Sequence, residues 1–129
     1  MIITRTVMTL GAAVVALGLS TGAYAGDVAK ETATAQAHAG MAASATAIAM
    51  VHAHLHHVVN CLVGPKGTGY DAAQANPCKD QGDGAIPDAT DAAAKAKMAM
   101  AVSKAQDGIK TDDLAAATKA AGEAAAALK

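Results

Sequence analysis

The sequence predicts an all-α protein: a small antiparallel helical bundle with one long helix, a disulfide-stapled loop and two shorter helices. More than a quarter of the 129 residues are alanine, which has the highest helix propensity. The β-branched runs typical of strands are few. The larger apolar side chains recur at intervals of three and four residues, which is the period of a helix face. A chain of this length is enough for a single domain.

Residues 1–25 have the composition of a secretory signal peptide that is cleaved. Arg5 supplies a positive charge, residues 7–19 form an apolar run, and residues 23–25 (Ala-Tyr-Ala) have the small-x-small pattern that signal peptidase accepts. The apolar run is shorter than the roughly 20 residues of a membrane-spanning helix. We therefore expect residues 26–129 to form one helical domain, periplasmic or secreted, with no membrane association after cleavage.

The two cysteines, Cys61 and Cys78, both lie in the predicted mature domain. They allow a single intramolecular pairing, and disulfides persist in the oxidising compartments that exported proteins reach. A loop of this size gives a disulfide worth about 3 kcal/mol. A thiolate metal site is the alternative, and the compartment favours the disulfide.

One long helix is expected from about Lys30 to Val63. The segment from Thr32 to Pro65 contains no Lys, Arg, Asp or Glu, and its larger side chains follow an alternating spacing of four and three over three heptads. The positions of this seam are Met41, Ala45, Ile48, His52, Leu55, Val59 and Leu62. Gly64 and Pro65 end the helix, because proline cannot continue it and glycine suits its C-cap.

Residues 64–87 hold all three prolines and five glycines, which predicts a long loop. The disulfide would tie the first half of this loop to the end of the long helix. A second helix is expected from Pro87 to about Asp107 with Gly108 as its C-cap, and a third from the N-cap Thr111 to Leu128. Three helices bury few bulky residues, so a homodimer could complete the bundle.

Charge and aromatic content exclude one class of function and argue against another. The formal net charge is -1 and only 2% of the residues are aromatic, whereas nucleic-acid binding needs phosphate neutralisation and stacking platforms. No nucleophile has an obvious Asp-His partnership, and few bulky residues are available to line a deep apolar pocket. We therefore expect neither nucleic-acid binding nor enzymatic activity.

The five histidines are the strongest functional signal in the sequence. Four of them fall in a six-residue stretch that begins at position 52. On a helix, His52 and His56 form an i, i+4 pair that could hold one metal ion. His54 and His57 form a stripe with Met50 on the opposite side, and a thioether beside imidazoles favours copper.

Three further residues are candidate ligands. His38 lies fourteen residues before His52, or about 21 Å along one continuous helix, so it should be unable to share the ion of the His52/His56 pair within one chain. It could define a second site with Met41. Met98, on the inner face of the second helix, could come opposite a histidine.

The function that these patterns favour is an exported metal-binding protein for sequestration or delivery, with copper preferred over zinc or nickel. Two alternatives stay open. One is a helical protein-interaction module whose histidines respond to pH near 6. The other is a bundle that binds haem non-covalently between a histidine and Met98, since the chain lacks the Cys-x-x-Cys-His motif of covalent attachment. The expected partners are a metal ion and a second copy of the chain.

Overall fold

The computed structural model describes residues 26–129, and the predicted signal peptide lies outside them. Every regular element of the described part is a helix, which confirms the predicted fold class. In chain order the helices are α1 (Val28–Ser44), α2 (Ile48–Val63), α3 (Ala85–Asp88), α4 (Ala92–Ile109) and α5 (Leu114–Ala127). None of these described helices combines the length and the hydropathy needed to cross a membrane.

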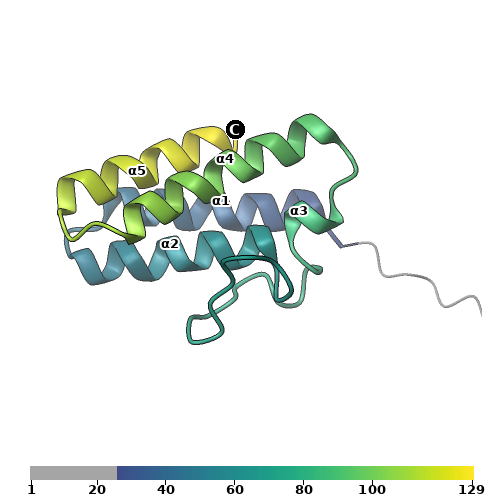
Figure 1. Ribbon diagram of the computed structural model, residues 1–129, viewed down its shortest axis with the longest axis horizontal. Helices are drawn as coiled ribbons and strands as arrows, with labels where there is room; N and C mark the ends of the chain where they lie inside the picture. Colours follow the sequence, from purple (N-terminus) through teal and green to yellow (C-terminus); the bar gives the residue numbers. More distant parts are fainter. Residues whose placement is uncertain (1–25) are drawn as a thin grey trace, which may run out of the picture.

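The four long helices form an antiparallel bundle in which each helix reverses the direction of the one before it (Figure 1). Helix α1 packs against α2 and α5, and α4 packs against the same two helices. The short α3 lies at one end, where it contacts α1, α2 and α4. Four helices therefore come from one chain, so the bundle reaches this number without a second copy.

The prediction of a single long helix is wrong, because the chain reverses at residues 45–47. Ala45 and Ala47 have extended backbone, with ψ of 145° and 132°. The hydroxyl of Ser44 donates to the carbonyl oxygen of Gly40 at 3.1 Å, a side-chain bond that competes with helix continuation. The regular 4-3 spacing of the sequence continues through this turn because the position of the seam that falls there is alanine. Alanine is tolerated both in a helix and in a turn.

Burial explains why the chain folds back here. Ala35, Ala39 and Ala42 of α1 are fully buried, and they lie against the bulkier apolar face of α2 that includes Val51 and Leu55. In a continuous helix these two faces could not pack against each other. The reversal removes both from water, and this burial outweighs the few helical hydrogen bonds that the turn loses.

Half of the buried core residues are alanines, and they pack with the valines and leucines of α2. Close packing also explains Gly108, which lies inside α4 and is not the C-cap that the sequence predicts; Lys110 caps the helix. A Cβ at Gly108 would lie 2.5 Å from Leu55 Cδ1 and 3.3 Å from the carbonyl oxygen of Ala117. Glycine at this position therefore lets α4 approach both α2 and α5.

Aspartates cap three of the helices. The side chains of Asp27, Asp91 and Asp113 each accept a hydrogen bond from the N–H three residues later, at 2.9, 2.7 and 2.6 Å. Asp113 thus takes the role predicted for Thr111, whose hydroxyl instead accepts from the Asp113 N–H. The predicted start of the second helix at Pro87 is also wrong, because this proline belongs to α3 and α4 begins at Ala92.

The long connection between α2 and α3 is fastened to the bundle near the end of α2. Cys61 and Cys78 form the predicted disulfide, with Cα atoms 5.1 Å apart. Gly64 is the C-cap of α2 at φ 70°, and a Cβ there would overlap the carbonyl oxygen of Asp83. The predicted stapling of the loop to this helix end is confirmed.

Candidate metal centre

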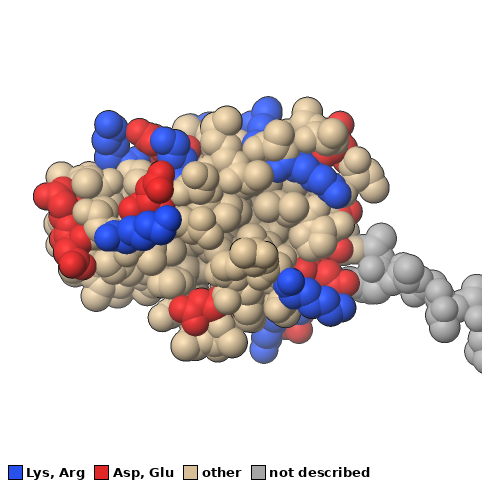
Figure 2. All heavy atoms as spheres, in the orientation of Figure 1, with Lys and Arg blue, Asp and Glu red and all other residues tan. Residues whose placement is uncertain are grey.

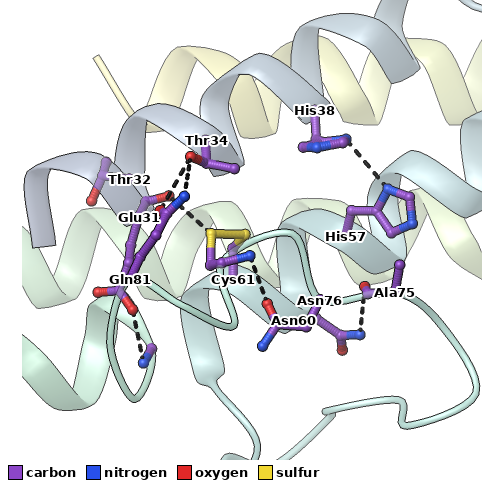
Figure 3. The surroundings of a disulfide bond; sticks show 12 residues. Glu31, Thr32, Thr34, His38, His57, Asn60, Cys61, Ala75, Asn76 and Gln81 are labelled. Carbon is purple, nitrogen blue, oxygen red and sulfur yellow. Dashed lines mark hydrogen bonds between the residues drawn. A yellow bond between two sulfur atoms is a disulfide. The ribbon is translucent and has the colours of Figure 1, made fainter. Parts of the chain in front are cut away.

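Three histidine side chains meet between α1 and α2. His38 comes from α1, and His54 and His57 come from α2. The Nδ1 atom of His38 lies 3.1 Å from that of His54 and 3.3 Å from that of His57. Figure 3 shows the rings of His38 and His57 reaching toward each other across the gap between the two helices. We refer to His38, His54 and His57 as the histidine triad.

The helical hairpin explains how this triad forms. His54 and His57 are three residues apart on α2, so they lie on the same side of that helix. Because the chain reverses after Ser44, α1 runs back along α2 and places His38 opposite them. The predicted separation of His38 from the clustered histidines along one helix is therefore wrong, because it assumed that the helix continued.

The spacing of the triad fits nitrogen atoms bound to one ion. Two nitrogen ligands at the usual distance from a tetrahedral metal lie about 3.3 Å apart. The two separations from His38 Nδ1 are 3.1 and 3.3 Å, and one potential ligand atom from each ring lies within 4.8 Å of the others. A single proton can bridge only two of three converging nitrogens, whereas a metal ion would bind all three lone pairs.

The surroundings keep imidazoles of the triad neutral. Burial lowers the pKa of His38, and the nearby His57 and His54 lower it further. Burial also lowers the pKa of His57, with His54 and His56 as the next causes. Neutral imidazole is the form that binds metal, so these two residues are prepared to act as ligands at neutral pH.

The other two clustered histidines bind protein groups on different elements. His52 Nε2 is 2.9 Å from the carbonyl oxygen of Thr111, to which its N–H can donate, in the connection between α4 and α5. His56 Nδ1 lies 3.5 Å from a carboxylate oxygen of Asp71 in the long loop. The structure does not bring this predicted pair into the triad, and a metal half-site at His52 and His56 stays a prediction.

The predicted methionine ligands lie outside the triad. Met50 is 51% exposed and precedes His54 by one helical turn, while Met41 is 50% exposed and follows His38 by one turn. Met98 is buried near the start of α1, where the Thr32 hydroxyl donates to its sulfur at 3.6 Å.

The haem alternative finds no support at Met98. The cavity beside this residue has a volume of about 170 Å³. Its lining consists of Val28, Thr32, Ala94, Lys97, Met98, Ala127 and Leu128. A histidine is absent from this set, so the cavity does not join Met98 to an axial imidazole.

Sequence reasoning missed Asn60, which fastens the long loop to α2. Its buried amide nitrogen donates to the carbonyl oxygens of Asp71 at 2.9 Å, Ala75 at 3.1 Å and Gln74 at 3.4 Å. Its amide oxygen accepts from the Asp71 N–H at 2.9 Å. A polar residue inside the apolar run 58–63 is the signal that could have identified it, because such a residue must find buried partners.

Comparison with known proteins found no match: no family model, no curated protein and no solved structure is similar to this chain at a significant level.

Proposed function

We propose that the chain is an exported protein that binds one transition-metal ion at His38, His54 and His57. The observation that carries this proposal is the convergence of three imidazole nitrogens from two helices, at separations of 3.1 and 3.3 Å from His38 Nδ1. Among the described residues these three imidazoles have hydrogen-bond contacts only with one another, and a cation would join all three nitrogens where a proton can join only two.

Copper is the metal we favour. Imidazole ligands suit copper, zinc and nickel, and among divalent ions of the first row copper forms the most stable complexes. Met41 and Met50 each lie one helical turn from a triad residue and are half-exposed, so their thioethers could assist binding of Cu(I). Zinc and nickel are the competing metals.

Sequestration or delivery is the role we propose for the bound metal. Three protein ligands leave a tetrahedral ion with one position for water or for a ligand from another molecule. The triad residues are partly exposed, so such a ligand could approach from solvent. The leader-like residues 1–25 and the Cys61–Cys78 disulfide both support a location outside the cytoplasm.

Metal titration of single variants tests the proposal. Purified protein starting at residue 26 would be titrated with Cu(II), Zn(II) and Ni(II) against a competing chelator, and the bound metal counted by elemental mass spectrometry. We expect one tightly bound ion and at least a tenfold loss of affinity in each of His38→Ala, His54→Ala and His57→Ala. His52→Ala is the matched control and should retain the affinity.

Two results would contradict the triad as the site. One is a His38→Ala variant that binds as tightly as the unmodified protein. The other is a greater loss in His52→Ala than in the triad variants, which would favour the predicted His52/His56 pair. Tighter retention of zinc or nickel than of copper would leave the site in place and change the metal.

A further inference from the structure

A second cluster of ionisable groups lies at the start of α1, at the end of the bundle where α3 packs. Glu31 is fully buried there, and one of its carboxylate oxygens, Oε1, accepts from the Gly84 N–H at 3.0 Å. The other oxygen, Oε2, has no hydrogen-bond partner among the described residues. A buried carboxylate oxygen without a partner is costly, so a missing donor is expected nearby.

The charges that shift the pKa of Glu31 are all negative. Burial is the main cause that raises the pKa of Glu31 to about 6, the Gly84 hydrogen bond opposes it, and the carboxylates of Asp88, Asp27 and Asp83 raise it further. Acidic atoms are also exposed at this end of the bundle, with basic atoms next to them (Figure 2). The missing partner of Oε2 should therefore be a cation.

The first described residue, Gly26, lies against this cluster. The N–H of Asp27 donates to the carbonyl oxygen of Gln81 at 2.8 Å, which holds the start of the chain beside residues 81–82. A Cβ at Gly26 would overlap Asp88 Oδ2 and lie 3.0 Å from the Gly82 Cα. A side chain at Gly26 would therefore have to displace the Asp88 carboxylate.

Gly82 connects this position to Glu31. A Cβ at Gly82 would lie 2.8 Å from Glu31 Oε1, 2.8 Å from the Gly26 Cα, and in overlap with Asp88 Oδ2. Two glycines therefore leave a small gap in which the start of the chain meets the carboxylates of Glu31 and Asp88. The nitrogen of Gly26 is one bond from the Cα that borders this gap.

We propose that cleavage after Ala25 creates the missing cation, and that the α-ammonium group of Gly26 pairs with the carboxylates of Glu31 and Asp88. Hydrolysis of the Ala25–Gly26 peptide bond places the hydroxyl of water on the Ala25 carbonyl carbon and a proton on the Gly26 nitrogen. The amine then takes up a second proton from solvent. Its N–H groups supply a donor for Glu31 Oε2, and its charge offsets the acidic cluster.

This inference concerns the predicted cleavage and is independent of the metal site. It makes removal of the leader a step that completes the fold, because an uncleaved chain has an amide at Gly26 where the mature chain has a charge. It also accounts for glycine as the first mature residue, since a side chain would collide with Asp88. The precursor should therefore be less stable at neutral pH than the mature chain.

Two chains that differ by one residue test the proposal. The first begins at Gly26 with a free amine, and the second retains Ala25, which moves the amine about 3.8 Å along the chain. A third chain carries an acetyl group on Gly26, which removes the charge and adds no residue. The side-chain carboxyl of Glu31 and the terminal amine would be titrated by NMR, and thermal unfolding recorded at pH 7.

We expect the pKa of Glu31 to be at least one unit lower in the Gly26 chain than in the other two. The amine of that chain should titrate above its ordinary pKa of about 8. Its melting temperature should be the highest of the three, and Glu31→Gln should reduce the difference, leaving only the contribution of Asp88. This last comparison separates the ion pair from a general effect of the terminus.

Two outcomes would overturn the proposal. In the first, the pKa of Glu31 and the melting temperature are the same in all three chains. In the second, millimolar Ca²⁺ lowers the pKa of Glu31 and raises the melting temperature equally in all three, which would assign the gap to a divalent cation and not to the amine.

Discussion

His38 on α1 and His54 on α2 face each other with their Nδ1 atoms 3.1 Å apart, although sixteen positions separate them in the sequence. The contact exists because the chain reverses at residues 45–47. His57 joins the same point from the next turn of α2, with its Nδ1 3.3 Å from that of His38. The reversal of the chain between α1 and α2 thus decides whether the histidines form a site.

The pH dependence of metal binding should reflect the pKa values of the triad. Metal competes with protons for the imidazole nitrogens, so affinity falls as pH falls. Because burial lowers the pKa of His38 and His57, these ligands stay neutral below the ordinary histidine value of 6.5. We expect similar affinity at pH 7.5 and 6.5 and a clear loss by pH 5, measured by chelator competition. If the affinity for metal already falls strongly as the pH is lowered from 7.5 to 7, a different set of ligands would be indicated.

Removing the Asn60 side chain should destabilise the protein strongly. Asn60→Ala leaves the buried N–H of Asp71 and two or three carbonyl oxygens without a partner, which should cost about 2–3 kcal/mol of unfolding free energy. Asn76→Ala is the control in the same loop, because Asn76 makes a single local bond to the Cys78 N–H and its loss should cost less. Urea unfolding measures both, and equal losses would contradict the anchoring role of Asn60.

Two glycines in helices should respond to alanine in opposite directions. Gly108→Ala places a methyl group 2.5 Å from Leu55 Cδ1, so we expect a loss of about 1–3 kcal/mol. Gly122→Ala in α5 meets no atom within 4 Å and should stabilise the protein by about 0.5–1 kcal/mol. Thermal unfolding of the two variants checks this, and a stabilising Gly108→Ala would show that α4 is less closely packed than described.

Loss of the disulfide should lower stability without removing the metal site. The Cys61–Cys78 bond joins two residues that are 17 positions apart in the sequence. Replacing both cysteines by serine should therefore lower the free energy of unfolding by about 3 kcal/mol. The triad is positioned by the packing of α1 on α2, which this bond does not join. We therefore expect copper affinity within about threefold of the parent under conditions where the variant is folded. A tenfold loss would show that the loop supports the site.

Local rules account for the part of the structure that the sequence predicted. The alanine content predicts helices, the two cysteines predict the disulfide, and Gly64-Pro65 predicts the end of α2. His54 and His57 also follow from helical spacing alone. These features depend on residues that are neighbours in the chain, or on the only pairing that two cysteines allow.

The remaining features depend on tertiary packing. The turn at residues 45–47 lies in an alanine-rich segment with no Gly or Pro to mark it, and it forms because two helix faces gain burial by meeting. His38 could not be placed in the site until that turn was known. Asn60 and Glu31 were missed for a similar reason, since each acquires its role from loop residues that are distant in sequence.

Counting the imidazoles bound to copper tests whether His38, His54 and His57 form one metal site. Pulsed electron paramagnetic resonance of the Cu(II)-loaded protein, with one equivalent of metal, reports how many imidazole groups coordinate the ion. We expect three for the unmodified protein, two for His38→Ala and three for His52→Ala. A spectrum that is the same with and without His38 would contradict the site, because it would leave α1 without any part in metal binding.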